Sequence, residues 1–198
     1  MGDLDETINS AVEHARESRL NSIVAVLVAL AATLMALDNI KDGNVTQAMS
    51  QAQTHAVDAW SYYQAKSTKE NLAEATIEQL QALRATAPSG SAGLADLDKR
   101  IALYQSQSAR YEKEKGEIKA QAEGYERDYD RLNLHDDQFD LSDAGFSVAI
   151  ALLGVTALTR KRWLLGFAGL FLLIGVVFGL AGFFSWSLHP GGVMAWLS

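Results

Sequence analysis

The side chains best placed for chemistry are carboxylates that fall in two short stretches of the sequence. Asp136, Asp137 and Asp140 lie close together, and Asp38 and Asp42 lie far earlier in the chain. Carboxylate oxygens are the ligands that hard divalent cations prefer. If the chain folds back so that the two stretches meet, Asp136, Asp137 and Asp140 are the candidate metal ligands, and no other metal ligand is predicted.

Two other roles for these acids stay open. Carboxylates that encircle an axis shared by several copies would form the acidic mouth of a cation pore. Alternatively, Ser142, Asp140 or Asp143 caps the start of a following helix, because short polar side chains accept hydrogen bonds from the free N–H groups there. The capping role is the one we favour.

No other pattern in the sequence predicts catalysis. A nucleophile elbow, a zinc-binding HExxH pair, a phosphate loop and a dinucleotide fingerprint are all absent, and the chain has no cysteine. The histidines lie in regions that we do not expect to converge: His14, His55, His135 and His189. We therefore predict no catalytic residue, no cofactor-binding residue and no enzymatic activity.

The elements that must position these residues follow from the distribution of charge. Charged residues are absent from 20–37, 144–159 and 163–188, and each run is close to the length of a helix that crosses a membrane. The region 38–143 carries 12 basic and 19 acidic residues, which argues against nucleic acid as a partner. Because no span carries an ionisable side chain, a pump or secondary transporter is disfavoured.

Basic residues beside the spans predict the orientation. The link 160–162 is Arg-Lys-Arg, and Arg16 and Arg19 precede the first span; such residues mark the cytoplasmic side. The predicted topology is a short amphipathic cytoplasmic helix at 1–19, with 38–143 and an interfacial tail at 189–198 on the periplasmic side of a bacterial inner membrane.

The region between the first two spans reads as one long helical hairpin. Two helices, at about 45–86 and 94–134, are separated by a turn at 87–93 that holds a proline and two glycines. From Leu94 to Leu132, mostly apolar and aromatic residues recur in alternating steps of three and four, which is the signature of a coiled coil. If the turn is centred near 90.5, residue i lies opposite residue 181 minus i.

That pairing rule predicts a polar layer inside the hairpin. It sets Lys66 in the layer of Lys115 and Glu70 in the layer of Tyr111. Two lysines in one layer repel unless a carboxylate lies between them or their ammonium groups reach out to water. The layer either fixes the register of the two helices, or marks a switch point, or is a solvated gap, and we favour the gap.

Apolar residues outside the predicted helix contact indicate a second contact surface. In the first arm these are Val57, Trp60, Tyr62 and Leu72, and a two-helix hairpin leaves them uncovered. In the third span, Gly175 and Gly179 form a GxxxG pattern that lets helices approach closely. We predict that these six residues contact another copy in a homo-oligomer.

The most distinctive string is Asp58-Ala59-Trp60-Ser61-Tyr62-Tyr63-Gln64-Ala65-Lys66-Ser67. Together with its flanks from 51 to 72, and with the layout of one span, a charged hairpin and two more spans, it resembles the bacterial membrane family known as domain of unknown function 4337. The resemblance implies a bacterial membrane protein of similar length. It implies no activity, cofactor or site residue.

These observations combine into one prediction of fold and function. The fold class is an all-α membrane protein with three transmembrane helices and a long antiparallel coiled-coil helical hairpin outside the membrane. The function is structural or scaffolding, and the partners are membrane lipid, further copies of the chain and a larger membrane complex. Two alternatives stay open: an oligomeric cation pore with an acidic outer mouth, and a periplasmic sensor.

Overall fold

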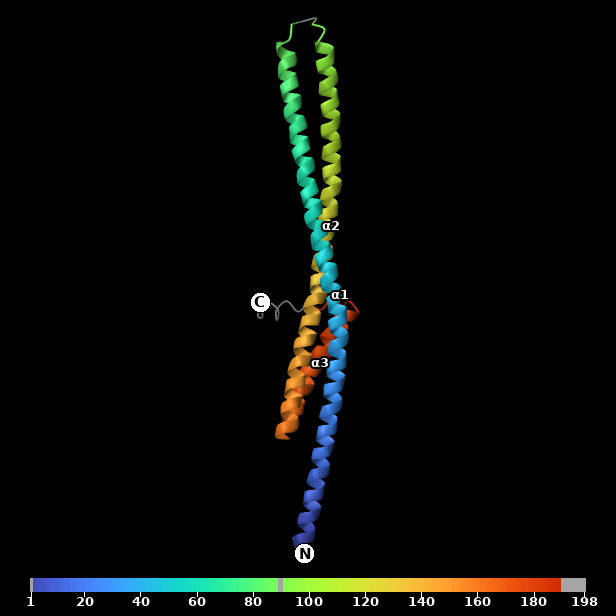
Figure 1. Cartoon of the computed structure of the whole chain (residues 1–198), viewed down its shortest axis with the longest axis vertical. Coiled ribbons are helices and arrows are strands. Elements are labelled where there is room, and N and C mark those ends of the chain that lie inside the picture. Colours follow the sequence, from blue (N-terminus) through green and yellow to red (C-terminus); the bar gives the residue numbers. More distant parts are fainter. Residues whose placement is uncertain (1, 89–90, 190–198) are drawn as a thin grey trace. The chain divides into compact units, whose positions relative to one another are not determined.

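Three long α-helices account for nearly all of the chain that the structure describes. The structure is a computed structural model that describes the backbone of residues 2–88 and 91–189, with the side chains of Val12, of 14–88 and of 91–189. The helices are α1 (Gly2–Thr86), α2 (Leu94–Thr159) and α3 (Trp163–Phe183), and they can be followed by colour in Figure 1. Within the described residues there is no strand, so the all-α prediction is confirmed.

The helices are longer than the predicted segments. Predicted span 20–37 and predicted arm 45–86 both lie within α1, and the second arm and second span both lie within α2. Proline, the strongest helix breaker, occurs only at Pro88 and Pro190. The helices end accordingly, with α1 ending at Thr86 and α2 beginning at Leu94.

Two predicted segments lie partly outside the described residues. The backbone of 2–19 is the first part of α1, but the side chains that would form its apolar face before Val12 are not among those described. In the predicted tail 189–198, only His189 is described.

The chain forms two compact units. The three-helix unit comprises Met1–Ala48 and Arg131–Ser198, and the two-helix unit comprises Met49–Asp130. The three-helix unit contains α3 and one part each of α1 and α2. The two-helix unit contains the remaining parts of α1 and α2, which run antiparallel beside each other (Figure 1).

In the two-helix unit, the predicted contact face of α2 is confirmed by burial. Every position of the three-and-four pattern from Leu94 to Tyr129 is buried or half-buried. Pairs across the unit include Trp60 with Glu126, and Arg84 with Asp98. The residue numbers in these pairs add to 186 and 182, so the predicted sum of 181 holds to within five residues, or about 1.4 helical turns.

In the three-helix unit, a small apolar core lies where the helices meet. Val24 of α1, Leu153 of α2 and Ala168 of α3 are buried against one another. Before Leu153 in α2, Phe139 and Phe146 are also fully buried. Outward-facing side chains of the same unit are also apolar, including Leu30 at 55% and Leu173 at 59% exposure. The three helices are each long and apolar enough to cross a membrane.

Candidate functional site

A buried polar junction joins the three helices where the first predicted span ends. Asp38 of α1 is 5% exposed and Ser142 of α2 is fully buried. The Ser142 hydroxyl donates to the carbonyl oxygen of Gly175 on α3 at 2.7 Å, and its oxygen also lies within hydrogen-bond distance of Asp38 Oδ2. A Cβ on Gly179 would lie 2.6 Å from Asp38 Oδ2, so only glycine leaves room for this junction.

Ser142 has a different role from the one predicted. The capping interpretation for Ser142, Asp140 and Asp143 is wrong, because α2 runs unbroken from Leu94 and has no N-terminus there. Inside a helix, the backbone N–H groups already bond to carbonyl groups one turn earlier. The Ser142 side chain is therefore available for bonds to the other two helices.

The proton of Ser142 allows two hydrogen-bond arrangements at this junction. A hydroxyl carries one proton and two acceptor lone pairs. When Ser142 donates to Gly175, its contact with Asp38 is a hydrogen bond only if the Asp38 carboxyl carries a proton and donates it to Ser142. When Ser142 instead donates to an ionised Asp38, the carbonyl oxygen of Gly175 still accepts the backbone N–H group one turn later in α3.

Replacing Asp38 distinguishes the two arrangements. Asp38→Asn keeps a neutral group that can donate to Ser142, so its thermal unfolding midpoint should stay close to that of the parent. Asp38→Ala removes the donor and should lower the free energy of unfolding by about 1–3 kcal/mol. Calorimetry of the full chain in detergent measures both. An Asn variant as unstable as the Ala variant would show that Asp38 is ionised.

The predicted metal ligands do not form a metal site. Within the described residues, no group of three or more His, Asp or Glu side chains comes together to hold a metal ion, and this includes Asp136, Asp137 and Asp140. Asp136 instead accepts a hydrogen bond from Thr46 at 2.9 Å.

Burial, followed by mutual repulsion, raises the pKa values of this acidic group. Burial, and then the charges of Asp136 and Asp140, raise the pKa of Asp42 to about 6. Burial, followed by neighbouring aspartates, also raises the pKa of Asp137 and Asp140. Carboxylates without a counter-ion at close range hold their protons more tightly.

A glutamine that the sequence analysis did not single out binds the segment that follows α3. Gln138 is fully buried, and its amide nitrogen donates to the carbonyl oxygens of Trp186 at 2.8 Å and Leu188 at 2.7 Å. Its oxygen lies 3.2 Å from His135 Nδ1. In the sequence Gln138 lies between Asp137 and Phe139, a pattern that does not predict these partners.

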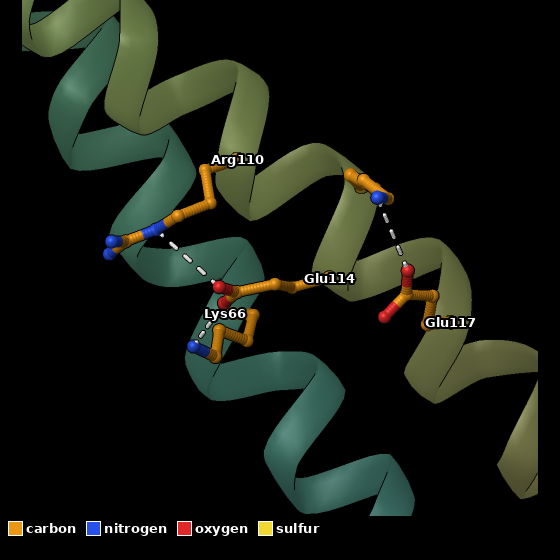
Figure 2. A network of polar contacts seen from close by, with 5 residues as sticks. Lys66, Arg110, Glu114 and Glu117 are labelled. Carbon is orange, nitrogen blue, oxygen red and sulfur yellow. Dashed lines mark hydrogen bonds and ion pairs between the residues drawn. The ribbon is translucent and has the colours of Figure 1, made fainter.

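The polar layer of the two-helix unit consists of two ion pairs. Lys66 binds Glu114, and Lys115 binds Glu70. Figure 2 shows that Glu114 also faces Arg110, 3.4 Å away. The side chains of Lys66 and Glu70 are only 11% and 9% exposed, so the solvated-gap interpretation is wrong.

Lys66 binds a partner one residue from its predicted layer, and Lys115 binds a partner four residues from its predicted layer. The predicted layers place Lys66 beside Lys115 and Glu70 beside Tyr111, whereas each lysine binds a glutamate of the opposite helix. Long side chains can cross that distance. The hydrogen bond to Glu114 raises the pKa of Lys66 and lowers that of Glu114, and the bond to Glu70 raises the pKa of Lys115. All three shifts favour the charged forms.

Tyrosines of the distinctive string surround these lysines. The Lys66 ammonium lies 5.1 Å from the ring centre of Tyr62, and the Lys115 ammonium lies 6.0 Å from that of Tyr63. A cation over an aromatic face is attracted by the ring quadrupole. The aromatic cluster therefore helps to hold the polar layer, a role that residue spacing did not predict.

The six predicted oligomer contacts divide into two groups. Val57, Tyr62 and Leu72 are between 54% and 68% exposed, so their predicted contact with another copy stays a prediction. The other three are engaged within the chain. Trp60 donates to Glu126 at 2.7 Å, and both Gly175 and Gly179 are buried against α1 or α2 side chains.

Each of the four histidines has its own contact partner. His14 lies near Glu17, His135 contacts Gln138 and His189 contacts the carbonyl of Ser187. His55, in the two-helix unit, packs against Tyr125 with ring centres 5.2 Å apart and ring planes tilted by 30°.

Comparison with known proteins gives one match. A family model described as Domain of unknown function (DUF4337) matches residues 20–185, which include most of both units. No curated protein and no solved structure matches the chain. The family description names no activity.

Proposed function

The chain belongs to the family described as Domain of unknown function (DUF4337), and we propose that it is a structural or scaffolding protein of the bacterial inner membrane. In this proposal it has no enzymatic activity. The three-helix unit anchors it in the membrane, and the two-helix unit is a coiled-coil hairpin that binds further copies or a larger membrane complex.

Membrane anchoring is supported by the surface of the three-helix unit. Its outward-facing side chains include Val26 at 59%, Leu37 at 50% and Leu170 at 53% exposure. In water such a surface would drive aggregation, whereas lipid chains cover it without cost. The basic link 160–162 would lie in the cytoplasm, which puts the two-helix unit in the periplasm.

Oligomerisation is supported by one observation above all, an uncovered apolar face on α1. In the described part of the two-helix unit, the exposed large apolar side chains are Val57, Tyr62, Leu72 and Leu83 on α1, with Leu103 alone on α2. Tyr62, Leu72 and Leu83 are spaced by about three helical turns, so they lie on one side of the helix. A groove of about 270 Å³, which Val57 and Trp60 help to line, adjoins this face.

A charge on this face tests the proposal. Leu72→Glu should lower the particle mass of the full chain in mild detergent, because a carboxylate buried between copies is costly. Leu103→Glu is the matched control: it places the same charge on an exposed leucine of α2 and should leave the mass unchanged. Light scattering after size exclusion gives the mass.

Three results would contradict the proposal. A parent that is monomeric in native membrane extract excludes oligomerisation, and equal effects of the two glutamate variants exclude the α1 face as the contact. A ring of copies with a continuous lumen would instead favour the cation pore, with Asp42 and Asp140 near its outer mouth.

A further inference from the structure

A basic pocket lies where the three predicted spans meet their cytoplasmic ends. It has a volume of about 250 Å³ and is lined by Arg16, Glu17 and Leu20 of α1 and by Arg160 and Arg162 of the α2–α3 link. Span 20–37 begins at Leu20, span 144–159 ends just before Arg160, and span 163–188 begins just after Arg162.

The backbone of the link sets the positions of its two arginines. Arg160 has a φ of 58° and donates its N–H to the carbonyl oxygen of Thr156 at 2.8 Å, which ends α2. This left-handed conformation is uncommon for a residue other than glycine. Arg162 is the N-cap residue of α3, so the positive end of that helix dipole adjoins the pocket.

The pocket has an excess of positive charge. Three guanidinium groups face one carboxylate, that of Glu17, which gives a net charge of +2. Glu17 binds Arg160. Within the described residues, Arg16 and Arg162 have no carboxylate partner. An anion with more than one acceptor oxygen would satisfy them, since guanidinium groups bind phosphate oxygens in pairs.

One wall of the pocket is apolar. Leu20 is 6% exposed and begins the first apolar run. Trp163, which follows Arg162, is 61% exposed and contacts Phe167 edge to face; exposed tryptophans are enriched at membrane interfaces. A ligand that suits this pocket has a phosphate at the level of the arginines and hydrocarbon along the spans.

We propose that Arg16, Arg160 and Arg162 bind the phosphate of an anionic phospholipid in the cytoplasmic leaflet. This inference rests on the membrane anchoring proposed above. A zwitterionic choline lipid carries a cation that the pocket repels, so the site selects lipids such as phosphatidylglycerol. The bound lipid would tie α1 to the α2–α3 link.

Selectivity for spin-labelled lipids tests the site. The full chain is reconstituted in phosphatidylcholine vesicles, and electron paramagnetic resonance gives the association constant of labelled phosphatidylglycerol relative to labelled phosphatidylcholine. The parent should prefer phosphatidylglycerol. Arg16→Gln and Arg162→Gln should each lower the preference about fivefold. Glu17→Gln should raise it, because it removes the competing carboxylate.

Lys161→Gln is the matched control. It removes one positive charge from the same link, but Lys161 does not line the pocket, so the preference should be unchanged. If Lys161→Gln lowers the preference as much as Arg162→Gln does, diffuse surface charge is responsible and the site does not exist. Displacement of the labelled lipid by inorganic phosphate at matched ionic strength would show that the pocket takes a soluble phosphate, and would overturn the lipid assignment.

Alkaline extraction separates failure of this inference from failure of the proposed function. A parent that stays in the vesicles but shows no preference for phosphatidylglycerol overturns the lipid site alone. A parent that alkaline carbonate removes from the vesicles overturns membrane anchoring, and the lipid site with it.

Discussion

Gly145→Ala should separate α2 from α3. A Cβ at this position would lie 2.8 Å from the backbone nitrogen of Gly175 and 3.0 Å from the carbonyl oxygen of Phe171. Backbone atoms cannot rotate away as a side chain can, so α3 must shift. Overpacking of this kind costs about 1–3 kcal/mol, and we expect the upper part of that range. Calorimetry should show a lower unfolding midpoint.

Gly154→Ala is the matched control for that experiment. Gly154 lies in the same predicted span of α2, and a Cβ there meets nothing within 4 Å. The same chemical change should therefore leave the midpoint at or slightly above that of the parent, because alanine favours helix more than glycine does. Hydrogen exchange should rise in α3 only for the Gly145 variant. If the two variants behave alike, α2 and α3 do not approach closely at Gly145.

Glu70→Lys should open the two-helix unit around the polar layer. The change removes the partner of Lys115 and adds a cation between Lys66 and Lys115, which are held mostly out of water. Like charges at low exposure repel strongly and cannot be relieved without separating the helices. Hydrogen exchange of the full chain should rise sharply in 60–75 and 108–120.

The reversed pair distinguishes charge from shape. Glu70→Lys combined with Lys115→Glu restores one cation and one carboxylate at the same positions, and should recover most of the protection from exchange. The difference between the double variant and the single variants measures the coupling of the pair. Lys113→Glu, a reversal at an exposed site of α2, should have little effect. If the double variant is no more protected than Glu70→Lys alone, the pair does not set the register.

The two experiments address the two proposed roles of the chain. The close approach at Gly145 holds together the unit that anchors the protein, and the ion pairs hold together the unit that presents the α1 face. Because Gly145 and Glu70 belong to different units, their variants should change exchange in separate segments. A change in particle mass that accompanies only Glu70→Lys would link the polar layer to oligomerisation.

The sequence alone determined that the chain is helical, where the turn between α1 and α2 lies, and which face of α2 is buried in the two-helix unit. Helix breakers are local, so Ala87-Pro88 and the glycines after it predicted where α1 ends and α2 begins. The three-and-four spacing on α2 depends only on the helical repeat, and it predicted the face that turns toward α1. The three runs without charged residues, which predicted the membrane spans, can likewise be recognised without knowledge of distant contacts.

Only the tertiary structure decided which partners the polar residues and glycines meet. Ser142 resembles a helix cap in sequence, but it joins three helices because α2 continues through it. In the sequence, Gly145 and Gly154 each lie between two apolar residues of the same predicted span. In the structure, Gly145 faces the backbone of α3, whereas a Cβ at Gly154 would meet nothing within 4 Å. Lysine and glutamate side chains span about a turn, so the pairing rule located their layer without naming their partners. Such contacts depend on the orientation of each helix about its own axis. The sequence pattern predicts which broad face of a helix is buried, but it does not fix that orientation closely enough to predict individual contacts.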